Sequence, residues 1–320
     1  MSLRDKTISG LGWTTTARVI QQILQFGISV LLARLLSPEA FGLVGMIHIF
    51  TGFASLFSDG GFGSALVQAK SINEGHRSSV FWLNILIGST LTGIVIAVAP
   101  WIASFYGEPI LEALTFVSAF QFTIGALGNV HSSLFRRAMD FKKITIVQIT
   151  AKLVSGGVGV YLALTGFGVW SLVWQGILSS CANVASVWIL SPWRPQFLFE
   201  KDAIKELLRF SGNLLGFNLV NYWTRSADDL LIGKMVGSAG LGVYTKAYGL
   251  MLLPIRQITS VISSVMFPAL SRIQDDMERI RRVYLKATRI IAFATMPMMC
   301  GLLVVAEPFV LALFGPQWEE

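Results

Sequence analysis

Long apolar stretches make up most of the chain, and short polar or glycine- and proline-rich joins separate them. A helix needs about 20 consecutive apolar residues to cross the hydrocarbon core of a bilayer. Stretches of that length recur from one end of the chain to the other, so the pattern predicts an all-α polytopic membrane protein. We place nine candidate spans, at residues 12–36, 41–68, 79–104, 111–135, 144–165, 168–190, 207–233, 240–265 and 284–313.

The joins between the spans alternate in charge, and this sets the expected orientation. Joins such as "QAKSINEGHR" and "FRRAMDFKK" are rich in Lys and Arg, whereas "LLSPEAFG" and "FYGEPIL" are nearly uncharged. Basic joins remain on the cytoplasmic side of a membrane. We therefore expect the N-terminus and the basic joins to be cytoplasmic.

The composition supports the same class. Hydrophobic residues make up 53% of the chain and charged residues only 13%, against about 25% charged in soluble domains. A soluble domain has no core large enough for so many apolar side chains. Cys181 and Cys300 lie in different spans and indicate neither a disulfide framework nor a metal site.

Two parts of the chain resemble each other at an offset of 200 residues. "ARLLSPEAFGLVG", from Ala33, aligns with "GKMVGSAGLGVYT", from Gly233. A second pair of similar segments, "APWIASFYG" and "AEPFVLALFG", aligns Gly107 with Gly315, at an offset of 208. Six spans separate the copies, so both cross the membrane in the same direction. This predicts a two-lobed exporter fold built from parallel repeats.

The repeat also predicts the domain organisation. We expect an N-terminal lobe of six spans at 1–190, a cytoplasmic linker with a surface helix at 191–206, and a partial C-terminal lobe at 207–320. The second lobe has only about three of its six spans. We therefore expect the complete protein to continue for about three more spans of about 20 residues each.

Polar side chains form a stripe on each of two repeat-related spans. Ionisable groups inside a bilayer are costly, so they usually face a partner or a water-filled cavity. Under the offset of 200, Arg18 overlies Asn218 and Gln25 overlies Arg225, which predicts one cavity between the lobes. The stripe residues are Arg18, Gln21 and Gln25 in the first span and Asn218, Asn221 and Arg225 in the seventh.

The predicted cavity is modestly cationic. Lys152 and Arg256 complete the candidate substrate-binding set. The candidate charge partners are Asp59 for Arg18, and Asp228 or Asp229 for Lys246. A cationic site near the middle of a membrane favours an anionic ligand, and the forked guanidinium of Arg suits phosphate. The alternative is that these groups form hydrogen bonds between helices or extend to the membrane surface.

Signals for enzymatic chemistry are weak. His48, His76 and His131 are scattered, and "SGGVGV" inside a span is typical of close helix packing. Asp275 and Asp276 form an acidic pair in a charged join, where a metal site of a sugar-nucleotide transferase and a solvated surface are the alternatives. We favour the surface and predict no catalytic residue, no metal site and no cofactor. Transport is favoured over catalysis.

Several segments carry a resemblance to a known family. They are "GLGWTTTARVIQQILQFGISVLLARLLSPEAFGLVGM", "FSDGGFGSALVQ", "FRRAMDFKK", "GFGVWSLVWQ", "FPALSRIQDD" and "LFGPQW". They resemble Wzx-type polysaccharide flippases of the multidrug/oligosaccharidyl-lipid/polysaccharide exporter superfamily, in the colanic acid and teichuronic acid branch. The resemblance covers essentially the whole chain.

The resemblance implies a protein of twelve to fourteen spans in the bacterial inner (cytoplasmic) membrane. Such proteins translocate undecaprenyl-diphosphate-linked oligosaccharide by alternating access, for lipopolysaccharide or exopolysaccharide biosynthesis. It also implies coupling to a proton gradient, a sodium gradient or the membrane potential. The expected partners are membrane lipids and polysaccharide assembly proteins, with no nucleic acid.

Together these observations give a hypothesis for the site. The diphosphate binds among Arg18, Arg225 and Arg256, and the Gln and Asn side chains of the stripes contact sugar hydroxyls. One alternative is a cation-coupled multidrug exporter of the same superfamily, which needs an acidic, aromatic-lined pocket. Another is a membrane-bound polysaccharide polymerase or glycosyltransferase, which needs a large outer loop, whereas every outer join here is short.

Overall fold

The computed structural model describes residues 3–58, 60–69, 71–200, 212–271 and 276–319 of the 320-residue chain. Every regular element within these ranges is helical, which confirms the predicted all-α class. The chain forms two compact units, Met1–Gly242 and Val243–Glu320. We describe each unit by itself.

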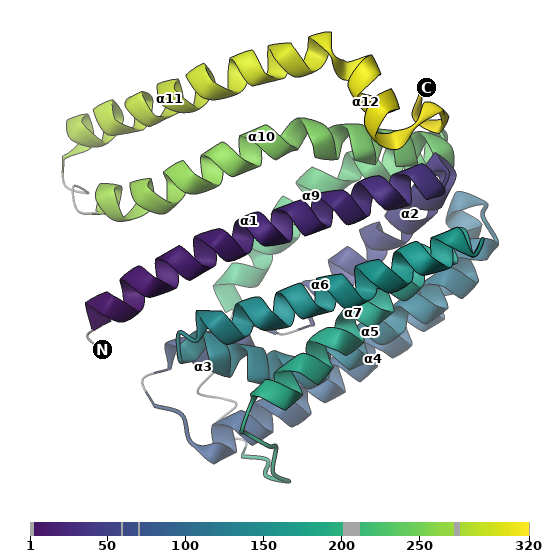
Figure 1. Ribbon diagram of the computed structural model, residues 1–320. Helices are drawn as coiled ribbons and strands as arrows, with labels where there is room; N and C mark the ends of the chain where they lie inside the picture. Colours follow the sequence, from purple (N-terminus) through teal and green to yellow (C-terminus); the bar gives the residue numbers. More distant parts are fainter. Residues whose placement is uncertain (1–2, 59, 70, 201–211, 272–275, 320) are drawn as a thin grey trace. The chain divides into compact units, whose positions relative to one another are not determined.

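The first unit holds most of the helices (Figure 1). They are α1 (Leu3–Leu35), α2 (Pro38–Ser55), α3 (Phe62–Gln68), α4 (Glu74–Tyr106), α5 (Ile110–Arg137), α6 (Phe141–Leu164), α7 (Trp170–Leu190), α9 (Gly212–Met235) and the start of α10 (Ser238–Ser271). The second unit holds the rest of α10, α11 (Met277–Val304), α12 (Ala306–Phe314) and the short 3-10 helix η1 (Pro316–Trp318). Five of the helices, α4, α5, α6, α7 and α11, are long and apolar enough to cross a membrane, so the protein is a multi-pass membrane protein.

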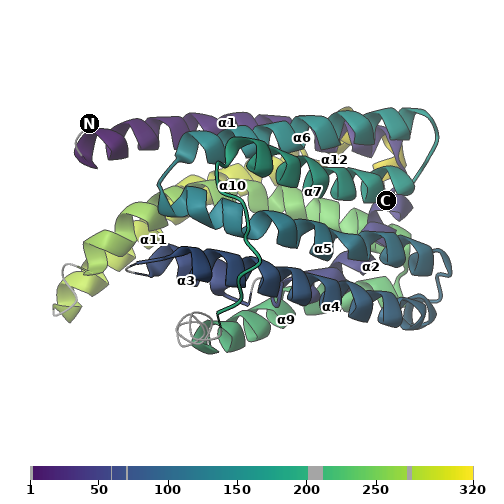
Figure 2. The same cartoon turned by 90° about the horizontal axis from the view of Figure 1, so that it is seen from below.

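Two antiparallel hairpins, α4–α5 and α6–α7, form the centre of the first unit. α5 packs on α7, and α1 packs on α6 (Figures 1 and 2). Small residues allow these helices to approach: a Cβ on Gly88 of α4 would lie 2.7 Å from the carbonyl oxygen of Phe122 on α5. α9 packs on α2, where the Tyr222 hydroxyl donates to the Ile49 carbonyl. The unit is therefore a bundle with α5 at its centre.

The second predicted span, 41–68, is not one continuous helix. α2 ends at Ser55 and α3 begins at Phe62, with a turn between them. Gly60 and Gly61 in this turn have φ of 54° and 80°, a conformation that residues with a side chain rarely adopt. Apolar residues lie on both sides of the turn, which is why the sequence predicted a single span, although Ser58, Gly60 and Gly61 interrupt the apolar pattern. The ninth span is likewise divided, since α11 ends at Val304 and α12 begins at Ala306.

The repeat of 200 residues is present in the helix boundaries. α1 ends at Leu35 and α2 begins at Pro38, and α9 ends at Met235 and α10 begins at Ser238. The same turn is therefore made twice at the predicted offset. This agrees with the predicted parallel repeat.

The two repeat-related turns also pack against each other. A Cβ on Gly42 would lie 1.6 Å from the carbonyl oxygen of Ser238, and a Cβ on Gly242 would lie 1.9 Å from that of Pro38. Positions 38 and 238 correspond under the offset, and so do 42 and 242. The contact is reciprocal, as expected about a two-fold axis, and it requires glycine on both sides.

The two similar segments "APWIASFYG" and "AEPFVLALFG" each end a helix at a glycine, one in each unit. Gly107 follows α4 and donates its N–H to the Ala103 carbonyl, and Gly315 follows α12 and donates to the Leu311 carbonyl. Both glycines have positive φ, 76° and 98°. The shared "FYG" and "LFG" endings therefore both stop a helix at a glycine with positive φ, which is left-handed helical at Gly107 and has an extended ψ of 173° at Gly315.

The segment from Ser191 to Glu200 is extended and lies on the start of α4. The Gln196 N–H donates to Ser78 Oγ at 3.1 Å, and the Gln196 carbonyl accepts from Trp82 Nε1 at 2.8 Å. The Glu200 N–H donates to Ser79 Oγ at 2.7 Å. The surface helix predicted within 191–206 lies outside the described residues, and the lobe boundaries at 190 and 207 stay a prediction.

Candidate functional site

One group of predicted site residues lies where α1 meets α6. Gln21 Nε2 donates to Gln148 Oε1 at 2.8 Å, and Lys152 follows Gln148 by one helical turn on α6. Gln25 is exposed on α1. The side chain of Arg18 and the whole of Asp59 lie outside the described residues. The structure thus brings Gln21 close to an unpredicted partner, Gln148.

A second group lies on α9. Arg225 Nε donates to Asn221 Oδ1 at 3.3 Å, one turn away, and both side chains are exposed. Asn218, Asp228 and Asp229, on the same helix, are half-buried. Because α9 packs on α2 and α1 packs on α6, the two groups belong to different helix pairs.

Two predicted residues belong to the second unit. Lys246 on α10 places its Nζ over the rings of Phe314 and Trp318, 5.8 and 6.0 Å from their centroids. Arg256 is exposed on the same helix. A cavity shared between lobes, and the pairing of Lys246 with Asp228 or Asp229, stay predictions.

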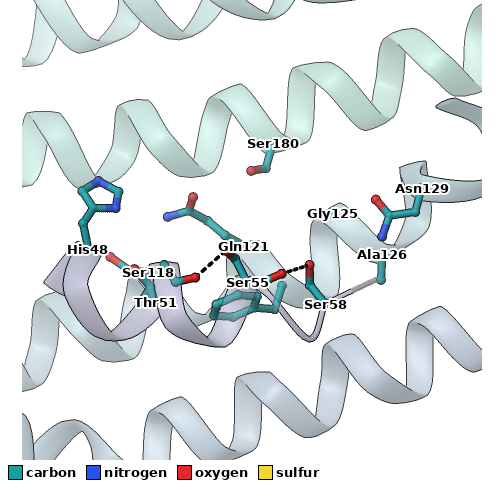
Figure 3. A pocket seen from close by; sticks show the side chains of 12 residues that line it. His48, Thr51, Ser55, Ser58, Ser118, Gln121, Gly125, Ala126, Asn129 and Ser180 are labelled. Atoms are coloured by element: carbon teal, nitrogen blue, oxygen red, sulfur yellow. Dashed lines mark hydrogen bonds between the residues drawn. The ribbon is translucent and has the colours of Figure 1, made fainter. Parts of the chain in front are cut away.

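A pocket that the sequence analysis did not identify lies inside the first unit, between α2, α5 and α7 (Figure 3). Its volume is about 320 Å³. Sites between the helices of a bundle are common places for ligands. The pocket is lined by His48, Thr51, Gly52, Ser55, Ser58, Ser118, Gln121, Phe122, Gly125, Ala126, Asn129 and Ser180.

The break between α2 and α3 forms one wall of this pocket. Ser55 Oγ donates to the Gly52 carbonyl at 2.6 Å, and Ser58 Oγ donates to the Ser55 carbonyl at 2.7 Å (Figure 3). The hydroxyls thus add hydrogen bonds to carbonyls at the end of α2, and the Ser55 carbonyl also accepts from the Ser58 N–H at 3.1 Å. The turn is polar and lies beside the pocket because the helix stops there.

A polar face of α5 forms the opposite wall. Ser118, Gln121, Gly125 and Asn129 follow one another at intervals of three or four residues and line the same pocket. The face continues to Arg136, which lines a second pocket of about 70 Å³. The other residues of this smaller pocket are Ser132, Phe135, Ile144, Val147, Gln148, Asn183 and Val187.

The sequence carried a signal for this face. Polar residues recur at helical spacing from Ser118 to Arg136 within a predicted span. All but Arg136 are uncharged, so they lack the charge that marks the predicted site residues. Gln148 and Asn183 are likewise uncharged, and the smaller pocket brings them beside Arg136.

Comparison with known proteins identifies relatives along the whole chain. Residues 31–320 match the profile of a family described as "Polysaccharide biosynthesis protein". The chain is 30% identical over 318 residues to the succinoglycan biosynthesis transport protein ExoT of Rhizobium meliloti, covering 99% of this chain and 64% of that protein. It is also 30% identical to the teichuronic acid biosynthesis protein TuaB of Bacillus subtilis, covering 99% and 66%.

A third relative is the lipopolysaccharide biosynthesis protein WzxC of Escherichia coli, 28% identical, with 100% of this chain and 65% of that protein covered. The chain therefore spans slightly less than two thirds of the length of these relatives.

Solved structures show the same fold. An inward-facing multidrug resistance MATE family transporter of the MOP superfamily superposes with a TM-score of 0.68 at 19% identity, covering 92% of this chain and 72% of that chain. The lipid II flippase MurJ, in an inward closed conformation, superposes with a TM-score of 0.72 at 19% identity, covering 94% and 67%. These likenesses confirm the exporter fold expected from the sequence.

Proposed function

The chain belongs to the polysaccharide biosynthesis protein family, and from this premise we propose that it is part of a flippase for lipid-linked oligosaccharide. The relatives named for transport or for assembly of succinoglycan, teichuronic acid and lipopolysaccharide support this activity. The cargo is an oligosaccharide on undecaprenyl diphosphate, moved from the cytoplasmic to the outer leaflet. The membrane is the bacterial inner membrane, and the N-terminus is cytoplasmic.

The polar face of α5 is the observation that carries this proposal. A sugar head group must cross the hydrocarbon layer, and polar groups in that layer are costly unless they serve a cavity or a partner. Ser118 to Arg136 covers about 27 Å of helix at about 1.5 Å per residue, close to the roughly 30 Å of the hydrocarbon core. The face therefore offers hydrogen-bonding groups over almost the whole crossing.

Basic residues bind the diphosphate of the substrate. Arg18, Arg225 and Arg256 are the proposed ligands, because guanidinium groups bind phosphate oxygens with two parallel hydrogen bonds. Arg136, at the basic end of the α5 face, is a further cation on the path. Movement of the diphosphate past these groups leaves the polyprenyl chain in the lipid.

The pocket supports a flippase over a cation-coupled multidrug exporter. The rival function needs an acidic and aromatic site. Among the described residues that line the larger pocket, none is Asp or Glu, and Phe122 is the single Phe, Tyr or Trp.

Surface polysaccharide in cells that carry the full-length protein tests the proposal. Arg225→Ala and Arg256→Ala should each abolish surface polysaccharide while the protein stays at its normal level in the membrane. Arg279→Ala, at an exposed position in the first turn of α11, is the matched control and should leave polysaccharide unchanged. Normal polysaccharide in both site variants would remove these residues from the mechanism.

Reconstitution tests the activity itself. Purified full-length protein in vesicles should move the lipid-linked repeat unit, extracted from the host cells, from one leaflet to the other. Exposure of the oligosaccharide to an added lectin measures this movement. No movement above that of protein-free vesicles would contradict the proposed function.

A further inference from the structure

We propose that the pocket between α2, α5 and α7 is a saccharide subsite that receives an uncharged sugar unit of the substrate and not its diphosphate. The inference rests on the proposed function, and it assigns a part of the substrate to a particular place in the fold. It is argued from the hydrogen-bonding capacity, charge and size of the pocket.

The α2 wall presents hydrogen-bond acceptors. Thr51 Oγ1 donates to the Ile47 carbonyl at 3.0 Å, and the hydroxyls of Ser55 and Ser58 donate to carbonyls of the same turn. Each proton is therefore already used, whereas a hydroxyl oxygen has two lone pairs that can accept. This wall is suited to a ligand that donates hydrogen bonds, as a sugar hydroxyl does.

The opposite walls present groups that both donate and accept. Gln121 and Asn129 come from α5 and Ser180 comes from α7 (Figure 3). Within the part of the chain that the structure describes, none of the three side chains has a protein hydrogen-bond partner. Leaving half-buried polar groups without hydrogen-bond partners costs free energy, so this cluster is suited to a ligand rich in hydroxyls.

The charge of the lining disfavours a phosphate as the main occupant. Among the described lining residues, none is Lys, Arg, Asp or Glu. A diphosphate carries charge that would have no countercharge on these walls, and burial of an unpaired charge is costly. Arg136 lies seven residues beyond Asn129 on the same face of α5, or about 10 Å along the helix. An anionic group therefore has its place next to the pocket, outside it.

The size and the apolar part of the lining suit a sugar ring. At about 30 Å³ per water molecule, 320 Å³ has room for about ten waters, which is ample space for one hexose. Phe122 and Ala126 give the pocket an apolar surface for the C–H groups of the ring. A single coordinated cation would leave most of this volume unfilled.

Gly125 gives a way to fill the pocket without disturbing the helix. It lines the pocket, and a Cβ at this position would meet no atom within 4 Å. Gly125→Leu should therefore occupy the space meant for the sugar. Gly93→Leu on α4 is the matched control, since Gly93 is also in a helix with no atom within 4 Å of its Cβ, and it lies outside the pocket.

The experiment compares two lipids on purified full-length protein. One is undecaprenyl diphosphate, and the other is the lipid-linked repeat unit extracted from the host cells. The unaltered protein and Gly93→Leu should bind the sugar-bearing lipid at least about tenfold more tightly, because several hydrogen bonds each contribute about two- to tenfold. Gly125→Leu should lose this preference and keep its affinity for undecaprenyl diphosphate.

A second variant pair tests the hydrogen bonds directly. The double variant Gln121→Leu/Asn129→Leu keeps much of the side-chain volume and removes both amides. Its preference for the sugar-bearing lipid should fall by about four- to a hundredfold, and the largest possible effect is complete loss of the preference. Gln175→Leu, on the face of α7 that packs against Gly159, is the control and should keep the preference. All variants are first checked for the same elution volume in detergent.

Two results would overturn the saccharide subsite. One is an equal loss of affinity for both lipids in Gly125→Leu, which would assign the pocket to the diphosphate. The other is an unchanged preference in Gly125→Leu and in the double amide variant. The proposed function fails separately, when the unaltered protein binds the sugar-bearing lipid more tightly but does not move it between leaflets.

Discussion

The absence of a single Cβ decides the contact between the two repeat-related turns. Gly42 and Gly242 each lie against a backbone carbonyl of the other turn, where an alanine methyl group would overlap the oxygen. Carbonyl oxygens of a helix start cannot rotate away as a side chain can. The backbones must therefore separate if either glycine is replaced.

Gly42→Ala and Gly242→Ala should each lower the free energy of unfolding by about 1–3 kcal/mol, the usual cost of overpacking. The measurement is the melting temperature of the purified protein in detergent. Gly27→Ala on α1, where a Cβ meets no atom within 4 Å, should be neutral or raise stability by up to about 1 kcal/mol. Equal melting temperatures for Gly42→Ala and Gly27→Ala would show that the contact between the two turns does not require glycine at position 42.

Arg137 has a comparable local role at the end of α3. Its Nη1 donates to the carbonyls of Leu66 and Ala69 at 2.8 and 2.6 Å, and to that of Val67 at 3.3 Å. These carbonyls lie at or just beyond the C-terminal end of a helix of only 7 residues. A helix leaves its last four carbonyls without partners within the helix.

Arg137→Gln should therefore cost about 1.5–3 kcal/mol, the range for hydrogen bonds to a charged group. Hydrogen exchange of the backbone amides in 62–69 should accelerate in this variant. Arg136→Gln, at the neighbouring exposed position, is the control and should leave that exchange unchanged. Unaltered exchange in both variants would show that α3 does not depend on this guanidinium group.

At the level of elements, α5 joins packing and function in one helix. One side meets α4 closely enough that Gly88 is required, and another side carries the polar face that lines both pockets. The helix break after α2 has a similar double effect, since it ends a span and places Ser55 and Ser58 beside the larger pocket.

The extended segment 191–200 is held on the start of α4 by its backbone. Trp82→Phe keeps an aromatic ring, which stacks on Phe197 at 5.0 Å, but removes the Nε1 donor to Gln196. We expect faster limited proteolysis within 191–200 in this variant. Trp101→Phe, at an exposed position on the same helix, should show the cleavage rate of the unaltered protein. Identical rates in both variants would show that the indole hydrogen bond does not hold the segment.

At the level of the whole molecule, the charge of the joins determines the orientation in the membrane. Met139, in the basic join between α5 and α6, and Phe167, in the uncharged join between α6 and α7, are 53% and 52% exposed. Positive joins should remain in the cytoplasm, so these two sites should lie on opposite sides.

Cysteine labelling tests this orientation, after Cys181 and Cys300 are replaced by Ser. Phe167→Cys should react with a membrane-impermeant maleimide on intact spheroplasts, and Met139→Cys should react only after lysis. The equal exposure of the two sites makes each a control for the other. The reverse pattern would place the N-terminus outside the cytoplasm.

Local sequence pattern was sufficient for the class of the protein, the approximate positions of its helices and the offset of its repeat. Apolar length, glycine, proline and charge act over a few residues of chain, so these features can be read locally. The span ends predicted at 36, 41, 233 and 240 lie within three residues of the helix boundaries at 35, 38, 235 and 238. The membrane-spanning character follows from the local pattern as well.

Which polar residues share a space became evident from the packing of the helices. It paired Gln21 with Gln148, 127 positions apart, and it brought the α2 turn, Gln121 and Ser180 around one pocket. It also showed that the apolar stretch after Ser55 contains a break. A hydrogen-bond partner or a pocket wall depends on how distant helices pack, and neither hydropathy nor helical spacing within one span specifies that packing.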